Sequence, residues 1–332
     1  MSKAIAVTNL VKQYNSLKAV DSVSFDVEEN EIFGCLGPNG AGKTTAIRCM
    51  TTLTRPTAGR LEIFGTSVIE NPDDVRKSIG YVPQSLSLTS ELSGYENLLI
   101  AAKIHGVSSD KRREKIEQML DLLGIGERAN DVVRHYSGGM MRRLEIGTAL
   151  IHSPKLLILD EPTIGLDPQG RRVIWELLRM LVKEHGITIF MTTHDMAEAD
   201  ALCQRIAIMN RGKIVAVGTP AELKRGLGGD IVTIEVKDNA KRAAALLEKQ
   251  GVKVNKINEK SISMVVESAE RRLAGFVESL ADGGVQIESI SAQKPTLDDV
   301  FLKCVGSRMG EVESGGEWQQ VRQVRRTIRR MG

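Results

Sequence analysis

A glycine-rich stretch near the N-terminus constrains this chain more than any other feature. Residues 37–45 read Gly-Pro-Asn-Gly-Ala-Gly-Lys-Thr-Thr, in which a glycine and four further residues precede Gly-Lys-Thr. The apolar run before it predicts a buried strand, and residues 44–50 after it predict a helix. Glycines permit a tight turn that presents backbone N–H groups, and the helix N-terminus adds unpaired donors and a partial positive charge. The stretch therefore predicts a site for nucleotide phosphates.

The chemistry of phosphate binding gives roles to two residues of this loop. Lys43 is expected to reach the outer phosphates, and the hydroxyl of Thr44 is expected to ligate Mg²⁺. A glycine-rich turn followed by an accidental Lys-Thr is the alternative, which the flanking strand and helix disfavour. The nucleotide-binding candidates in the loop are Gly37, Pro38, Asn39, Gly40, Ala41, Gly42, Lys43, Thr44 and Thr45.

Two acidic residues follow a run of four aliphatic residues at 156–159, which predicts a fully buried strand ending in Asp160 and Glu161. Carboxylates at such a place are costly to bury without a cation or a reacting partner. We expect Asp160 to act with Thr44 at the metal, and Glu161 to orient a water molecule for attack. The alternative is a solvated strand end. His194 follows the next predicted strand, 188–192, and is expected at the same sheet edge, near the terminal phosphate.

Further candidates carry weaker signals. Tyr14 ends a predicted strand upstream of the loop, where it either packs or stacks on a purine base. Gln84 ends the stretch 79–84, which predicts a strand running into a turn. It is either an exposed loop residue or a residue that ligates Mg²⁺ or positions water. Ser137 fits as the N-cap of a helix, and Gly138 and Gly139 would leave backbone N–H groups bare there, as in a second anion site.

Length and composition bound the class of protein. The chain has 332 residues, 42% of them hydrophobic and 26% charged, which suits about two soluble domains. No apolar run approaches the roughly 18 residues of a membrane span, and no secretory signal opens the chain, so we expect a cytoplasmic location. The segment 317–332 has a net charge of +4 and the remainder −1. A near-neutral body argues against nucleic acid as a partner.

The order of predicted elements indicates the domain organisation. Residues 4–28 alternate as antiparallel strands do, residues 85–150 form a helical block, and a glycine-rich boundary lies at 226–230. Beyond it, residues 231–290 follow the order β-α-β-β-α-β, which predicts a ferredoxin-like module that binds or regulates. The tail, 306–332, is either solvated or a basic amphipathic helix on anionic lipid.

These motifs, in this order, resemble the ATPase subunit of an ATP-binding-cassette transporter over residues 3–225. The resemblance implies that Gly37–Thr44 is the Walker A loop and Leu156–Asp160 the Walker B strand, with Glu161 as general base. It further implies an adenine-stacking Tyr14, a Q-loop Gln84, a switch His194, a D-loop Asp167 and a family signature at Tyr136–Met140. The signature departs from the usual pattern at both ends but keeps the serine and both glycines.

The resemblance implies a fold and an activity. The expected fold is α/β: a P-loop NTPase cassette with a mixed sheet, an antiparallel β piece and a helical subdomain, followed by a small α+β ferredoxin-like domain at 230–305. The expected cofactors are ATP and Mg²⁺, and the catalytic residues would be Glu161, His194 and Lys43, with Thr44, Gln84 and Asp160 at the metal. ATP would close a head-to-tail dimer in which Ser137–Gly139 and Asp167 reach the partner's nucleotide.

A narrower resemblance is to the daunorubicin-resistance type of drug-exporter subunit, carried by Pro295–Leu302 and by the small domain after the cassette. It implies a separate transmembrane permease, a second nucleotide-binding subunit and a peripheral place at the cytoplasmic face of the membrane. A soluble ATPase of this superfamily that acts on a non-transport partner is the alternative, as is a purely regulatory nucleotide switch.

Overall fold

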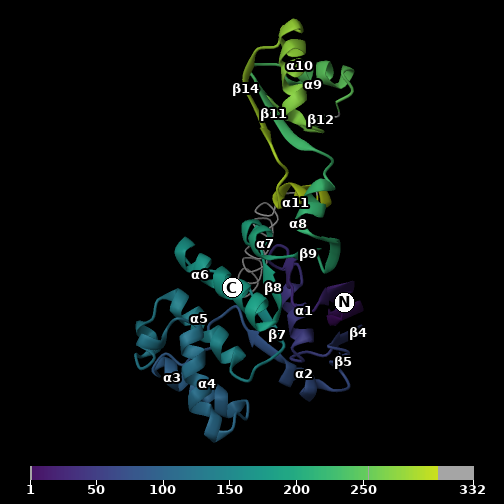
Figure 1. Ribbon diagram of the computed structural model, residues 1–332. Helices are drawn as coiled ribbons and strands as arrows, with labels where there is room; N and C mark the ends of the chain where they lie inside the picture. The colour runs from purple at the N-terminus through teal and green to yellow at the C-terminus, as the bar shows by residue number, and fades with distance from the viewer. Residues whose placement is uncertain (1, 253, 306–332) are drawn as a thin grey trace, which may run out of the picture. The chain divides into compact units, whose positions relative to one another are not determined.

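A computed structural model of the chain describes residues 2–252 and 254–305, which are drawn as ribbon in Figure 1. They divide between Thr219 and Pro220 into two compact units. The helix α8 (Pro220–Arg225) thus groups with the second unit, where it contacts α11 (Leu297–Val305), although the sequence analysis placed it with the first. The predicted basic tail, 306–332, lies outside the described residues. Among the helices described, none is long and apolar enough to cross a membrane.

The first unit is built on a six-stranded sheet in the order β10-β9-β3-β8-β7-β6. Every neighbouring pair is parallel except β10 and β9, which form an antiparallel hairpin at one edge. All residues of the central strands β3, β7 and β8 are buried, as expected of parallel strands covered on both faces. The strands are β3 (Ile32–Leu36), β6 (Ile79–Val82), β7 (Leu156–Asp160), β8 (Thr188–Thr193), β9 (Arg205–Asn210) and β10 (Lys213–Gly218).

The register of this sheet brings the ends of four strands to one edge. Leu36 pairs with Thr193, Asp160 pairs with Thr192, and Val82 pairs with Leu159. Because the strands run parallel, the segments that follow β3, β8, β7 and β6 all leave from the same side. In open α/β sheets that side holds the ligand.

A second sheet of the first unit is antiparallel, in the order β2-β1-β4-β5, as the alternation at 4–28 predicted. The two sheets share a core in which the rings of Phe25, Phe33 and Phe190 stack with centroids 5.4 to 6.0 Å apart. The strands are β1 (Lys3–Tyr14), β2 (Leu17–Glu28), β4 (Ala58–Ile63) and β5 (Thr66–Ser67).

Helices complete the first unit (Figure 1). The predicted helical subdomain consists of α3 (Gly94–Ile104), α4 (Ser109–Leu122) and α5 (Gly138–Leu150), which pack on one another, with 3-10 turns η1 (Gly126–Arg128) and η2 (Val133–His135). A capping box starts α3, in which Ser93 and Glu96 exchange side-chain and backbone hydrogen bonds. The other helices are α1 (Lys43–Met50), α2 (Pro72–Ser78), α6 (Pro168–His185) and α7 (Met196–Leu202).

The second unit has the predicted β-α-β-β-α-β order. Its strands form an antiparallel sheet in the order β12-β13-β11-β14, and the apolar residues of β11 and β13 form its core with those of α9 and α10. This is the ferredoxin-like arrangement. The elements are β11 (Asp230–Val236), α9 (Ala240–Lys249), β12 (Val254–Ile257), β13 (Ser261–Val266), α10 (Ala269–Asp282) and β14 (Ile287–Gln293).

Candidate active site

The glycine loop connects β3 to the N-terminus of α1, as the sequence predicted. Gly42 is the N-cap of α1 with φ of 107°, and a Cβ there would collide with the carbonyl oxygen of Ala19. A Cβ on Gly37 would likewise collide with the carbonyl oxygen of Met209. Glycine is therefore required at both positions. Because a glycine N-cap has no side chain to accept from the first N–H groups of α1, these donors remain for a ligand.

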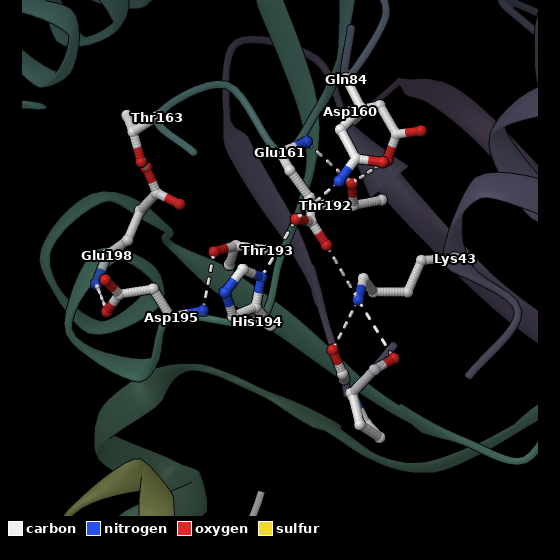
Figure 2. A network of polar contacts seen from close by, with 12 residues as sticks. Lys43, Gln84, Asp160, Glu161, Thr163, Thr192, Thr193, His194, Asp195 and Glu198 are labelled. Atoms are coloured by element: carbon white, nitrogen blue, oxygen red, sulfur yellow. Dashed lines mark hydrogen bonds and ion pairs between the residues drawn. The ribbon is translucent and has the colours of Figure 1, made fainter. Parts of the chain in front are cut away.

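Lys43 is buried at the edge of the sheet, with 4% of its surface exposed. Its Nζ donates to the carbonyl oxygens of Gly37 at 2.6 Å and Pro38 at 3.2 Å, and it lies 3.2 Å from Oε1 of Glu161 (Figure 2). The ammonium group is thus held between the loop and an acid from the neighbouring part of the sheet. A triphosphate would supply the same kind of oxygen acceptors.

Glu161 is the centre of the polar network in Figure 2. Its φ is 51°, a left-handed conformation that glutamate rarely adopts, and its N–H donates to the carbonyl and the hydroxyl of Thr192. Its Oε2 lies 3.1 Å from Nδ1 of His194 and 3.4 Å from Nε2 of Gln84. This strained residue therefore joins the loops that follow three strands.

The electrostatics of Glu161 favour its charged form. Burial by itself raises the pKa of this carboxyl group, but the hydrogen bond with His194 and the positive charge of Lys43 outweigh burial, so the pKa is lowered. The carboxylate is consequently ionised at neutral pH, as a group that accepts a proton must be.

Asp160 lies beside Glu161 at the end of β7, 1% exposed, and accepts a hydrogen bond of 2.5 Å from the hydroxyl of Thr192. Thr44 and Gln84 line the adjacent cavity. Gln84 donates to Glu161 through Nε2, which leaves its carbonyl oxygen as an acceptor. A hydroxyl, an amide oxygen and a carboxylate are the oxygen ligands that Mg²⁺ prefers, so these side chains have the right chemistry for that ion.

A cavity of about 640 Å³ lies over the glycine loop. Tyr14 lines it with 41% of its surface exposed, and the Nζ of Lys12 lies 4.8 Å from the centre of its ring. The cavity is also lined by the predicted residues Pro38–Thr45, Gln84 and Glu161. Lys18 and Arg211, to which no sequence signal pointed, line it as well. A cavity of this size with an aromatic ring at one end and a phosphate loop at the other suits a nucleotide.

A second cavity of about 470 Å³ joins the two remaining predicted motifs. Ser137 is the N-cap of α5 and accepts from the N–H of Met140 at 3.3 Å, while Asp167 is the N-cap of α6 and accepts from the N–H of Gly170 at 2.6 Å. Gly138 and Gly139 also line it. Among the described residues, the two cavities share no lining side chain. Ser137 therefore lines a different cavity from the one over the glycine loop.

Several residues of the site escaped the sequence analysis. Thr192, which holds both acids, looks like any threonine in a buried strand, and no signal marks it. Glu198 is 1% exposed and accepts from the hydroxyl of Thr163 at 2.6 Å and from Nε1 of Trp175 at 3.1 Å; burial raises the pKa of its carboxyl group. Its position four residues after His194, in the first turn of α7, was a usable signal.

A phosphate-binding loop at a helix N-terminus, with an acid pair and a histidine at the ends of adjacent parallel strands, defines an α/β nucleotide hydrolase. The comparisons narrow this class. Residues 20–164 match the family described as ABC transporter, and residues 218–305 match the C-terminal domain of ATP-binding proteins like DrrA1-3.

Relatives match almost the full chain. It is 38% identical to the daunorubicin resistance ATP-binding protein DrrA3 of Streptomyces coeruleorubidus, over 91% of this chain and 96% of that protein. It is 37% identical to the daunorubicin/doxorubicin resistance ATP-binding protein DrrA of Streptomyces peucetius, over 92% of this chain and 93% of that protein. The chain belongs to the ABC transporter family, as an ATP-binding subunit that hydrolyses ATP. Membership in this family favours a transporter ATPase subunit over a soluble ATPase that acts as a switch on a non-transport partner.

Solved structures agree with the fold. CbiO1 from Clostridium perfringens, part of an ABC transporter complex, superposes with a TM-score of 0.63 at 30% identity and covers 67% of this chain and 91% of that one. A dimeric ATP-binding cassette in a post-hydrolysis state with ADP and Pi superposes with a TM-score of 0.59 at 27% identity. The match covers 65% of this chain and 98% of that one. The predicted α/β cassette is confirmed.

Proposed function

We propose that this chain drives export of a drug-like or lipid-like compound by closing on ATP as a head-to-tail dimer. The observation that carries the proposal is the separation of the two half-sites. The glycine loop lines one cavity and Ser137 lines another, with no side chain in common among the described residues. An exposed helix N-terminus with bare N–H groups favours an anion, and the triphosphate on a second copy supplies it.

Within this dimer each residue has a proposed role. The N–H groups of the loop and Lys43 bind the phosphates, and Tyr14 stacks on the adenine. Glu161 accepts the proton of the attacking water, and His194 holds the carboxylate at Nδ1 and contacts the terminal phosphate. The partner copy contributes Ser137 with Gly138 and Gly139, and Asp167, to the same phosphates.

The metal fits the oxygen donors present. Thr44, Asp160 and Gln84 would hold Mg²⁺, which supplies charge neutralisation for the triphosphate when bound. Loss of the terminal phosphate after hydrolysis removes the anion shared by the two copies. The dimer would then open, so one phosphate switches the assembly between two states.

The surface between residues 84 and 105 is the proposed docking place of a separate membrane permease. Leu86, Ile100 and Ile104 expose 47%, 42% and 76% of their surface there. Exposed apolar side chains on the segment that follows Gln84 suit a surface that transmits closure to a partner helix. The chain would then be peripheral at the cytoplasmic face of the membrane, and its second unit, residues 220–305, would be an accessory domain.

Co-purification tests this function. The chain, expressed with an affinity tag in its own host, is expected to retain a polytopic membrane protein, and the purified pair is expected to hydrolyse ATP faster than the chain alone. Export is then tested by loading inverted vesicles with and without ATP, using amphiphilic drugs as cargo. An ATPase that binds no membrane protein, and whose rate no membrane fraction changes, would contradict the proposal.

A further inference from the structure

A buried ion pair in α5 lies outside the catalytic network. Arg142 and Glu145 are 3% and 1% exposed, and Nη1 of the arginine lies 2.9 Å from Oε2 of the glutamate. Burial lowers the pKa of Arg142 and raises that of Glu145, which shows how costly it is to keep both charged there. Buried pairs of this kind are often no more stabilising than apolar residues of similar volume. The pair therefore calls for a role other than stability.

Both charged groups bond the segment that follows β6. Arg142 donates from Nη1 to the carbonyl oxygen of Pro83 and from Nη2 to that of Gln84, each at 2.9 Å. Glu145 accepts through Oε1 from the N–H of Ser87 at 2.6 Å and from its hydroxyl at 2.9 Å. The pair thus fixes the beginning of this loop and a point three residues after Gln84.

Both ends of this connection belong to nucleotide half-sites. The side chain of Gln84 lines the nucleotide cavity and donates to Glu161, so its placement depends on the loop that carries it. Helix α5 starts beside Ser137, and Arg142 follows five residues later, roughly 7.5 Å along a rigid helix. A displacement of the Gln84 loop is therefore passed to the helix tip that faces the second copy.

The chemistry of the contact favours arginine over lysine. The planar guanidinium presents donors in a fixed fork, which matches two successive carbonyl oxygens, while an ammonium group is a single point charge. The carbonyl oxygens of Pro83 and Gln84 are successive acceptors of the backbone, and arginine binds both while still pairing with Glu145.

We propose that Arg142 and Glu145 are positioning residues that lock the Gln84 loop to α5, so that nucleotide contact by Gln84 and presentation of Ser137 to the partner are one movement. This inference rests on the proposed function. Neither side chain lines the cavity over the glycine loop. The pair acts through Gln84 on one side and through the tip of α5 on the other.

Arg142→Lys and Glu145→Gln test the lock, because each keeps volume and one hydrogen bond. We expect kcat to fall at least tenfold, while affinity of the monomer for a fluorescent ATP analogue stays within twofold. In a Glu161→Gln background, the ATP concentration for half-maximal dimer, measured by size exclusion with light scattering, is expected to rise at least fivefold. A structural role alone would lower the melting temperature without this split between binding and turnover.

The exposed pair Arg113 and Glu117 of α4 provides matched controls, since Nε and Oε1 lie 2.8 Å apart with the side chains 82% and 55% exposed. Arg113→Lys and Glu117→Gln are expected to change neither kcat nor the ATP concentration for half-maximal dimer. If both α5 variants fail to fold, Ser87→Ala tests the inference in their place, because it removes only the hydrogen bond from the Ser87 hydroxyl to Glu145. We expect kcat of this variant to fall two- to threefold at an unchanged melting temperature.

Two results overturn the inference. One is kcat within twofold of wild type in the folded α5 variants, or in Ser87→Ala if those do not fold. The other is a loss of monomer affinity equal to the loss of kcat. A wild-type chain that hydrolyses ATP without dimerising at all would instead refute the proposed function, and the inference with it.

Discussion

Glu161→Gln isolates the chemical step from nucleotide binding. The amide has nearly the volume of the carboxylate, so Lys43 keeps an oxygen acceptor besides the carbonyls of Gly37 and Pro38. What is lost is the proposed proton acceptor, and such a group typically contributes 10²- to 10⁴-fold, or roughly 3 to 5.5 kcal/mol of the barrier. The loss of a negative charge beside the phosphate site also removes repulsion, so ATP is expected to bind as tightly as in wild type or more tightly.

The assay combines phosphate release, calorimetric affinity for Mg-ATP and light scattering. We expect kcat to fall at least 10²-fold, the dissociation constant to stay the same or decrease, and a dimer to persist with ATP. The matched control is Glu62→Gln, which alters an acid paired with Arg60 on β4, away from the cavity, and should leave all three values unchanged. Turnover within threefold of wild type, or affinity lowered tenfold or more, would refute the role given to Glu161.

Three further predictions concern other parts of the first unit. Ser137→Arg is expected to abolish hydrolysis while the monomer keeps its nucleotide affinity in fluorescence titration; a large loss of affinity would place Ser137 in its own chain's site. Gly42→Ala should lower ATP affinity more than tenfold, because its φ of 107° and the carbonyl oxygen of Ala19 leave no room for a Cβ, and near-normal binding by calorimetry would contradict this. Burial, with the nearby His105, lowers the pKa of His152 to about 4, so protonation of His152 favours the unfolded state and stability falls as the pH drops from about 6.5 towards 4. Between pH 7.5 and 5 the free energy of unfolding is expected to fall by about 2 kcal/mol because of His152. In urea titrations the His152→Gln variant should therefore lose about 2 kcal/mol less than wild type over this range. Equal losses in the two proteins would exclude the effect.

The sequence predicted the strands and the parallel edge well because their signals are local. Four aliphatic residues before Asp160, and the glycine pattern around Lys43, each fix a strand end and a loop without knowledge of distant residues. Once β3, β7 and β8 are known to be parallel, the acids and His194 must lie at one edge. The antiparallel sheet and the order of the second unit followed from alternation in the same way.

The parts that escaped prediction depend on contacts between distant segments. Thr192 matters because it pairs with Asp160 on the neighbouring strand, a fact of register that its own neighbours in sequence do not encode. Arg142 and Glu145 lie three residues apart on a helix, and the sequence encodes neither their burial nor their contacts with the loop after β6. The grouping of α8 with the second unit also could not be predicted from local sequence, since its contacts with α11 join residues far apart in the chain.

The central claim, that each copy completes the nucleotide site of the other, is tested most directly by mixing two inactive variants. Lys43→Ala has a defective loop and an intact Ser137, while Ser137→Arg has the reverse. In a head-to-tail pair of the two, one site contains both intact halves and the other contains neither. Equal mixing of freely exchanging subunits should restore about a quarter of the wild-type ATPase rate, since half of the dimers are mixed and each has one of two sites intact. A mixture as inactive as its components, although pull-down through a tag on one variant shows mixed dimers with ATP, would contradict the account.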